Sequence, residues 1–225
     1  MAEASARPFF LSSIGKKYLM AVTGLVWAGF VLSHMAGNML ILVSSNLYNA
    51  YGHAIVSNKP LLFVAETVLV LAVVIHVATA IMLTLENKRA RPQAYAMSPN
   101  GTKGSSLASR TMAGQGSLIL AFIVLHISTF KYGTYYETTV NGVVMRDLHR
   151  LVVEVFHQPG YLAWYLLCLL LLGFHLSHGV GSIFQSLGLR SDKIANRLKK
   201  VSLAYGFIVA AGFLSQPIYV FFFNS

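Results

Sequence analysis

Residues 161–189 read YLAWYLLCLLLLGFHLSHGVGSIFQSLGL, a run of 29 residues without one Asp, Glu, Lys or Arg. A helix of roughly 20 apolar residues is long enough to cross the hydrocarbon core of a bilayer. Four other runs have a similar length and composition, at 18–43, 60–85, 112–130 and 201–224. The five runs together hold 124 residues and a single charged side chain, that of Glu66.

These runs are too long and too continuous for the strands of a membrane barrel, which alternate over about 10 residues. Because only helices and closed barrels can span lipid, the runs predict helices. We therefore predict an all-α membrane protein with five transmembrane helices in a bundle, forming a single integral membrane domain over residues 1–225.

The overall composition agrees with a membrane location. Charged residues make up 11% of the chain, about half of the roughly 25% usual in soluble domains. Hydrophobic residues make up 56%, which excludes a disordered chain. Cys168 is the only cysteine, so the chain can form neither an internal disulfide nor a cysteine-ligated cluster.

The net charge of +10 predicts the orientation of the helices. Of the 17 basic residues, 13 lie in the N-terminal segment and in the second and fourth connections, and four lie in the first and third. Connections that stay in the cytoplasm carry the excess of Lys and Arg. We expect a cytoplasmic N-terminus and an external C-terminus. Nucleic-acid binding is disfavoured, because the basic residues form no stripe with aromatic platforms.

The connections themselves carry less information. We predict a short outer connection over 44–59, an irregular inner connection over 86–111 and a long outer connection over 131–160. Within the last, residues 143–156 are compatible with a short amphipathic segment lying on the membrane.

Histidines are the informative polar residues inside the runs. Five of the eight lie there, and they are His34, His76, His126, His175 and His178. An ionisable side chain within a membrane is costly and therefore indicates a function. One buried histidine is more often a hydrogen-bonded structural residue. That explanation weakens here because each of the first four runs carries at least one and the fifth carries none.

Their depths sort them into an outer and an inner group. His34 lies 17 residues after Lys17, about 26 Å from the cytoplasmic side, and His126 lies 15 residues after Thr111, about 22 Å deep. These two form the outer pair.

The second and fourth helices run back towards the cytoplasm. His76 lies 10 residues before Glu86, about 15 Å deep; His175 and His178 precede Gly188 by 13 and 10 residues, about 20 and 15 Å. His76 therefore pairs with a histidine of the fourth helix. Depth alone leaves both histidines of that helix open.

Two pairs of histidines at two depths predict two haems with two axial imidazoles each, bound between facing helices. Small residues near the histidines leave space for a macrocycle or let helices pack closely; they are Gly24, Gly29, Gly37, Gly173, Gly179 and Gly181. Two alternatives are weaker. A zinc site would gather three or four ligands at one depth, and a proton relay would need more carboxylates than the one that the runs contain.

Several segments resemble the dihaem cytochrome b membrane anchor of succinate:quinone oxidoreductases, a family that includes fumarate reductases. The segments of the first helix are 13–17 (SIGKK), 20–24 (MAVTG) and 34–38 (HMAGN). The later ones are 48–53 (YNAYGH) with Pro60, Glu66 and His76 beyond it, and 175–179 (HLSHG). The resemblance extends over all five helices.

The resemblance implies five helices and two b haems in one chain. The inner, proximal haem would be held by the second and fourth helices, and the outer, distal haem by the first and third. This is the pairing that depth predicts. In the family the ligand of the fourth helix opens an H-x-S-x-G pattern, which His175 fits with Ser177 and Gly179. His175 is thus the predicted proximal ligand beside His76, and His178 is the alternative.

Two positions depart from the family pattern. Some of its fumarate reductases carry a glutamate two residues before the ligand of the fourth helix, where this chain has Gly173. A second acid, ahead of the second helix, corresponds roughly to Val56. The proton pathway and the quinone arrangement of those enzymes are not expected here.

The resemblance further implies the cytochrome b subunit of succinate dehydrogenase or fumarate reductase in a bacterial inner membrane. Such a chain anchors an iron–sulfur subunit on its cytoplasmic face, with a flavoprotein beyond it. It passes electrons between that iron–sulfur subunit and membrane quinone, either menaquinone or ubiquinone. FAD, the iron–sulfur clusters and the dicarboxylate site belong to the partner subunits.

Candidates for the quinone and its protons lie on the outer side. Glu66 is 19 residues from Leu85, about 28 Å from the cytoplasm and level with His34. It is either a proton carrier or a hydrogen-bonded structural acid. Further candidates are Tyr48, His53 and Lys59.

Two histidines of the outer connection, His149 and His157, are expected at the surface. Two other functions remain open. One is the cytochrome b subunit of another membrane dehydrogenase, such as a hydrogenase or a formate dehydrogenase, which would have the same two haems but a different partner. The other is a haem-free membrane transporter. A transporter is expected to show paired broken helices, and none is evident.

Overall fold

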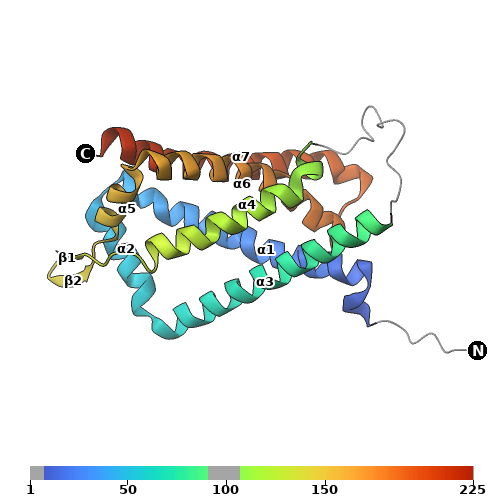
Figure 1. Cartoon of the computed structure of the whole chain (residues 1–225), viewed down its shortest axis with the longest axis horizontal. Helices are drawn as coiled ribbons and strands as arrows, with labels where there is room; N and C mark the ends of the chain where they lie inside the picture. Colours follow the sequence, from blue (N-terminus) through green and yellow to red (C-terminus); the bar gives the residue numbers. More distant parts are fainter. Residues whose placement is uncertain (1–7, 91–106, 225) are drawn as a thin grey trace, which may run out of the picture.

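A computed structural model describes residues 8–90 and 107–224. Within these residues five helical segments are long and apolar enough to cross a membrane, as predicted. The fold is mostly helical rather than all-α, because it also contains a short two-stranded hairpin. The spans are α1 (Ser13–Asn38) continued by the 3-10 turn η2 (Met39–Leu42), α3 (Lys59–Arg89), α4 (Leu107–Phe130), α6 (Pro159–Ser186) and α7 (Asp192–Phe223). They run alongside one another, with the described ends of the chain at opposite ends of the bundle (Figure 1).

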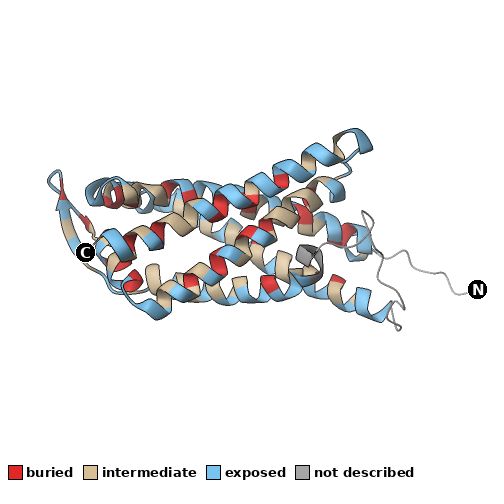
Figure 2. Cartoon of the chain, turned by 90° about the horizontal axis from the view of Figure 1, so that it is seen from above, coloured by how far each residue is buried: buried red, intermediate tan, exposed pale blue. Residues whose placement is uncertain are grey.

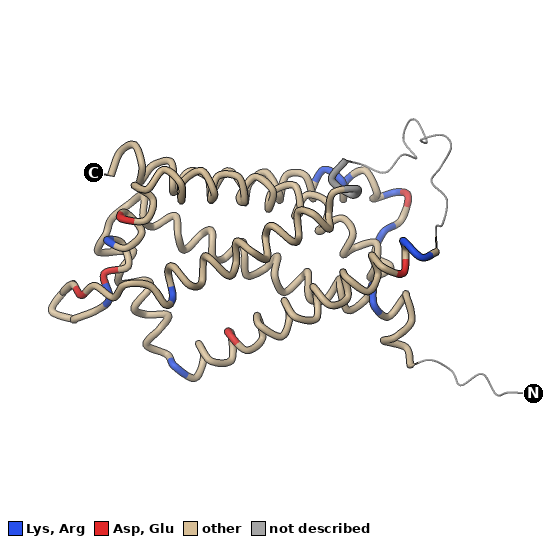
Figure 3. Tube along the Cα trace, viewed as in Figure 1, with Lys and Arg blue, Asp and Glu red and all other residues tan. Residues whose placement is uncertain are grey.

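Most helices extend beyond the predicted runs, because apolar composition marks only the part of a helix that lies in hydrocarbon. A short 3-10 turn, η1 (Phe9–Leu11), precedes α1, which begins after Ser12, whose side chain accepts a hydrogen bond from the Gly15 amide. Helix α7 begins at Asp192, so basic residues expected in a loop lie in its first turns. Charged residues accordingly gather at the two ends of the bundle (Figure 3).

Helix α6 is the exception, since it ends three residues before the predicted boundary. Gly188 has a φ of 73°, and the amide of Leu189 donates to the carbonyl of Phe184 at 2.9 Å. This is the left-handed helix end that glycine favours.

Helices α1 and α6 form the middle of the bundle. Helix α3 packs on α1, and α4 packs on α6, which also carries the long contact with α7. In α6, Gly173 lies so close to α7 that a Cβ at this position would be 2.7 Å from the Cβ of Ala210 and 3.2 Å from the carbonyl of Gly206. Small residues allow helices in membranes to approach in this way. Gly173 is therefore a packing position without space for a glutamate side chain.

The outer faces of the spans are apolar and exposed, as the surface of a protein in lipid should be (Figure 2). Helix α3 shows this clearly, because few of its residues are buried. Its exposed side chains include Leu61, Phe63, Val70, Val74 and Ile81.

An end cap covers the bundle where the C-terminus lies (Figure 1). It consists of α2 (Ser45–Ser57), the hairpin β1 (Glu137–Val140) and β2 (Val143–Arg146), and α5 (Leu148–Phe156). The connection predicted over 44–59 does join the first two spans, and most of it is helix α2. The segment 143–156 differs from the prediction: it begins as a strand, and only its second part is an amphipathic helix.

The apolar face of α5 packs onto the protein. Leu151, Val155 and Phe156 are buried in one cluster with Tyr165 of α6 and Val220 of α7. The end cap is thus continuous with the core of the outer half of the bundle, and α5 is held by this cluster.

Candidate functional site

The outer predicted pair is brought together by α1 and α4. The ring centres of His34 and His126 are 5.8 Å apart, with an angle of 87° between the ring planes. Both residues face inward from half-buried positions.

The inner pair joins α3 and α6. The ring centres of His76 and His175 are 6.4 Å apart, with the planes inclined at 61°. His178, the alternative on α6, has a different neighbour: its Nε2 lies 3.2 Å from the hydroxyl of Ser182 on the same helix. Of the two histidines of α6, it is His175 whose ring is adjacent to His76.

The distance between the pairs follows from two helices independently. Thr23 of α1 touches His76 and is 11 residues from His34, about 16 Å along a helix. Gly116 of α4 lies against His175 and is 10 residues from His126, about 15 Å. The pairs are therefore separated by about half the thickness of a hydrocarbon core, which is roughly 30 Å.

The spacing of the rings fits one metal ion in each pair. Two imidazoles on opposite sides of an ion, each bonded at about 2.0 Å, have ring centres about 6–6.5 Å apart. The observed 5.8 and 6.4 Å lie close to this value. The residues present thus fit an ion with two axial imidazoles, as in a bis-histidine haem.

Gly179 of α6 adjoins open space, because no side chain and no other helix lies within 4 Å of a Cβ built there. Gly29 of α1 and Gly114 of α4 also adjoin open space, but both are exposed at the surface of the bundle. Among the described residues, His, Cys, Asp and Glu side chains nowhere gather in groups of three or more that could hold a metal. A tetrahedral zinc site prefers three or four such ligands, so the paired arrangement favours a group with two axial positions.

Two histidine rings are held at Nδ1 by a neighbouring helix. Nδ1 of His76 lies 3.2 Å from the hydroxyl of Thr23 in α1. Nδ1 of His126 lies 3.1 Å from the hydroxyl of Tyr165 in α6. Metal-binding histidines commonly use their second nitrogen in this way. Neither Thr23 nor Tyr165 was a predicted site residue, because the sequence alone does not indicate which positions of neighbouring helices are level with each other.

The surroundings of the outer pair are aromatic. Phe30 stacks on His34 with ring centres 5.2 Å apart, and Phe213 approaches the same ring at 5.9 Å. Phe122 and Phe130 lie 5.7 and 5.3 Å from His126. The outer pair is thereby enclosed by apolar rings from three helices.

Glu66, the one acid of the apolar runs, is an ion-pair partner of Lys131 at the end of α4. Both side chains are partly exposed. This arrangement agrees with the structural alternative considered for Glu66. A role in proton transfer stays a prediction.

Of the other quinone candidates, Tyr48 has the closest link to a histidine. Its buried hydroxyl donates to Oδ1 of Asn38 at 2.9 Å, and the amide of Asn38 donates to the carbonyl of His34 at 2.8 Å. Burial raises the pKa of Tyr48 above its ordinary value. His53 is half-buried in α2, and Lys59 is exposed at the start of α3.

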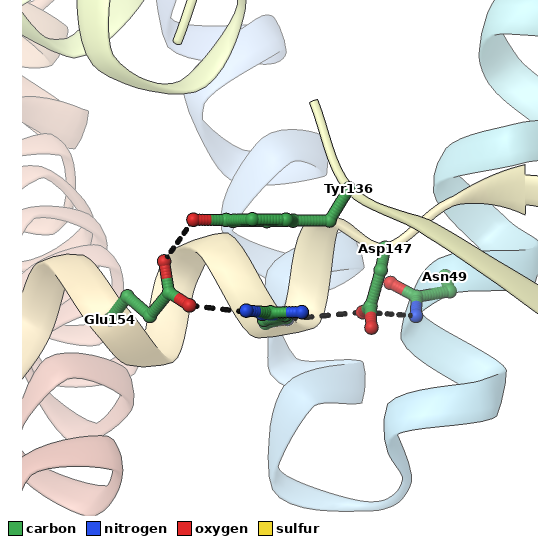
Figure 4. Close-up of polar contacts among 5 residues, drawn as sticks. Asn49, Tyr136, Asp147 and Glu154 are labelled. Carbon is green, nitrogen blue, oxygen red and sulfur yellow. Dashed lines mark hydrogen bonds and ion pairs between the residues drawn. The ribbon is translucent and has the colours of Figure 1, made fainter. Parts of the chain in front are cut away.

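A polar network in the end cap was not predicted from the sequence (Figure 4). Buried Asn49 of α2 donates to the carboxylate of Asp147 at 2.8 Å and accepts from the backbone amide of His149 at 2.9 Å. On α5, Glu154 accepts from Tyr136 at 2.6 Å and from Arg150 at 2.9 Å. These two bonds, first that of Tyr136, lower the pKa of Glu154.

His149 is half-buried rather than fully exposed, whereas His157 is exposed as expected. The ring of His149 lies 6.5 Å from that of Tyr48, and its Nε2 is 3.0 Å from the side-chain amide of Asn224. Burial lowers the pKa of His149, against an opposing effect of Asp147.

The opposite end of the bundle, where the N-terminus lies, is basic. Lys16 of α1 is buried and forms an ion pair with Glu86 of α3. Other basic residues of this end lie on the last turn of α3 and the first turns of α7; they are Lys88, Arg89, Lys193, Arg197, Lys199 and Lys200. Arg7, Arg91 and Lys103, which belong to the 13 basic residues counted for this side, lie outside the described residues.

Comparisons with protein families, with characterised proteins and with solved structures found no match for this chain.

Proposed function

We propose that this protein is a dihaem cytochrome b that anchors a succinate:quinone oxidoreductase, either a succinate dehydrogenase or a fumarate reductase, to a bacterial inner membrane. The observation that supports it best is the presence of two separate histidine pairs within the spans, each drawn from two helices and each spaced for one ion. His34 and His126 would hold the outer, distal haem. His76 and His175 would hold the inner, proximal haem.

Two bound haems would supply one-electron carriers between the two faces of the membrane. The task of the chain is to hold each ion between two imidazoles and to keep water away from it. The phenylalanines around His34 and His126 serve the second purpose at the outer pair. Burial and the partners of the axial ligands also adjust the reduction potential of such a centre.

The basic end supports the proposed place of the partners. With the N-terminus in the cytoplasm, as the charge distribution favours, this end would receive the iron–sulfur subunit, and the flavoprotein would lie beyond it. The inner pair is the closer of the two to this end. Electrons would therefore pass between the iron–sulfur subunit, the inner pair, the outer pair and a quinone.

The quinone is proposed to react near the outer pair. Tyr48 is the best supported of the candidate residues, because its hydroxyl is linked through Asn38 to His34. Glu66, His53 and Lys59 belong to the same side of the protein and remain candidates for proton exchange.

Purification of the complete native complex tests this function. We expect a reduced-minus-oxidised spectrum of b haem, two haems per copy of this chain, and a flavoprotein and an iron–sulfur protein that co-purify with it. Haem with a different catalytic partner would indicate the cytochrome of another dehydrogenase. Absence of b haem from the intact complex would overturn both cytochrome proposals.

A further inference from the structure

We propose that Thr23 and Tyr165 are positioning residues, each of which fixes one ligand in one of the two histidine pairs. Thr23 would orient His76 of the inner pair, and Tyr165 would orient His126 of the outer pair. This inference rests on the proposed function, since it assumes that the pairs bind haem iron.

The hydroxyl of Thr23 has a defined direction. It donates to the carbonyl of Leu19 at 2.8 Å, with that of Met20 at 3.2 Å as a second acceptor. Its oxygen is then free to accept from Nδ1–H of His76, 3.2 Å away. A neutral imidazole that carries its proton on Nδ1 has its lone pair on Nε2. Thr23 therefore selects the form of His76 that can bind iron through Nε2.

Tyr165 acts on the outer pair from a rigid position. Its side chain is 3% exposed, and its ring packs against Phe122 and Phe156 with centres 4.8 and 4.9 Å away. Its hydroxyl lies 3.1 Å from Nδ1 of His126. If His126 binds iron through Nε2, its Nδ1 would carry the proton, and this N–H would donate a hydrogen bond to the oxygen of Tyr165.

The other ligand of each pair lacks such a bond. Nδ1 of His175 has no partner among the described residues. The ring nitrogens of His34 are 3.4 and 3.5 Å from the amide nitrogen of Asn38, which is a donor and cannot accept a proton. In each pair, one histidine thus has a hydrogen-bond acceptor at Nδ1 and the other has none in the part of the chain that the structure describes. We call this hydrogen bond from Thr23 or Tyr165 a brace.

The two braces also connect the pairs to each other. Thr23 belongs to α1, the helix that carries His34 of the outer pair. Tyr165 belongs to α6, the helix that carries His175 of the inner pair. Each brace therefore joins a ligand of one pair to a helix that supplies a ligand to the other.

The potentials of the two haems in the complete complex provide the test. An acceptor at Nδ1–H makes an axial histidine more basic, which favours the oxidised iron. Thr23→Val keeps the shape of the side chain but removes the acceptor, so we expect both haems to be retained and the potential of one of them to rise. Tyr165→Phe should raise the potential of the other haem.

Three controls separate bracing from packing. Thr23→Ser restores the hydroxyl and should restore the original potential. Ser202→Ala removes a buried hydroxyl that bonds to the carbonyl of Leu198 in α7, a helix without a proposed ligand, and Tyr161→Phe removes a hydroxyl one turn from Tyr165 whose partner is Thr129. Both controls should leave the potentials and the electron paramagnetic resonance signals of both haems unchanged.

The outcomes are distinct for the two proposals. If the wild-type complex contains two haems but Thr23→Val and Tyr165→Phe leave both potentials and both resonance signals unchanged, the bracing is wrong and the cytochrome function stands. If both variants change the same haem, the assignment of one brace to each pair is wrong. If the wild-type complex contains no haem, the proposed function itself fails.

Discussion

The two histidine pairs lie in one bundle but have different surroundings. The outer pair is enclosed by phenylalanines and lies beside the end cap, whose buried cluster includes Tyr165. The inner pair lies among small residues: His76 faces Gly24 of α1, and His175 faces Gly116 of α4. The outer pair is thus held by side chains that fill space, and the inner pair by helices that approach closely.

This difference predicts different weaknesses. Around the inner pair, an added atom should do the most damage, because the helix contacts contain little free space. Around the outer pair, a removed hydrogen bond or ring should matter more, because the end cap depends on side-chain contacts. The following predictions test this contrast, from the largest expected effect to the smallest.

Loss of a ligand should have the largest effect and should distinguish His175 from His178. We expect His175→Ala to reduce the haem content of the purified complex from two to one per chain, and His178→Ala to leave it at two. The physical reason is that only the ring of His175 adjoins that of His76. Haem-to-protein ratios measure this directly. The reverse result would assign the inner ligand to His178.

Added volume between α6 and α7 should affect the inner pair next. Gly173→Ala places a methyl group 2.7 Å from the Cβ of Ala210, and overpacking of this kind costs roughly 1–3 kcal/mol. Since residue 173 is two positions from His175, we expect a lower unfolding temperature and earlier release of the inner haem on heating.

Gly160→Ala is the matched control for this substitution. It makes the same change near the start of the same helix, far from the inner pair, where no side chain and no other segment lies within 4 Å of the new methyl group. Alanine is a better helix former than glycine, so this variant should be as stable as the wild type or more so. Equal stability of the two variants would contradict the close contact of α6 with α7.

Loss of Asn49 should affect the outer pair. Asn49→Ala removes one bond to Asp147 and one to the backbone of His149, and unpaired buried polar groups cost about 1–3 kcal/mol. We expect lower thermal stability and earlier release of the outer haem, with the inner haem unaffected. Ser57→Ala, which removes a hydroxyl bonded only to its own helix, should change neither. Preferential loss of the inner haem would refute the link between the end cap and the outer pair.

The sequence predicted the membrane part of the fold better than the end cap. A long apolar run without charge identifies a helix in lipid, because segments of a soluble protein rarely reach such a length without a charged residue. The end cap lacks this signal. Helix α2 contains Gly52, Asn46 and Asn49, which are weak helix formers, and it is stabilised by contacts with α5 and the hairpin. Such tertiary contacts are not visible in the local sequence.

The hairpin did have a local signal. Asn141 and Gly142 both have positive φ, 52° and 79°, and they form the two-residue turn between β1 and β2. Asn-Gly between short β-branched segments is a strong indication of such a turn. The prediction treated residues 143–156 as one amphipathic segment, so the strand that follows this turn was missed.

Pairing of the histidines was predictable because depth in a membrane is nearly one-dimensional. Counting residues from the ends of the helices places His34 with His126, and His76 with a histidine of α6, and these are the neighbours in the structure. Rotation about the helix axis is not contained in such a count. The partners Thr23, Tyr165 and Lys131 depend on rotation, so they emerge only from the packed bundle.

The smallest predicted effect is a pH dependence of the end cap that comes from His149. Burial holds its pKa below the ordinary value of 6.5, and its Nε2 lies opposite the amide of Asn224 as an acceptor. A histidine with a lowered folded-state pKa contributes its full stability above about pH 6.5, and that contribution declines as the pH falls below this value. We therefore expect the unfolding temperature of the complex to fall between pH 7 and 5, and to fall less in His149→Gln, whose side chain stays neutral.

His157→Gln is the control, because it changes an exposed histidine and should keep the wild-type dependence on pH. If His149→Gln and the wild type show the same dependence on pH, the acid sensitivity of the protein comes from groups other than His149.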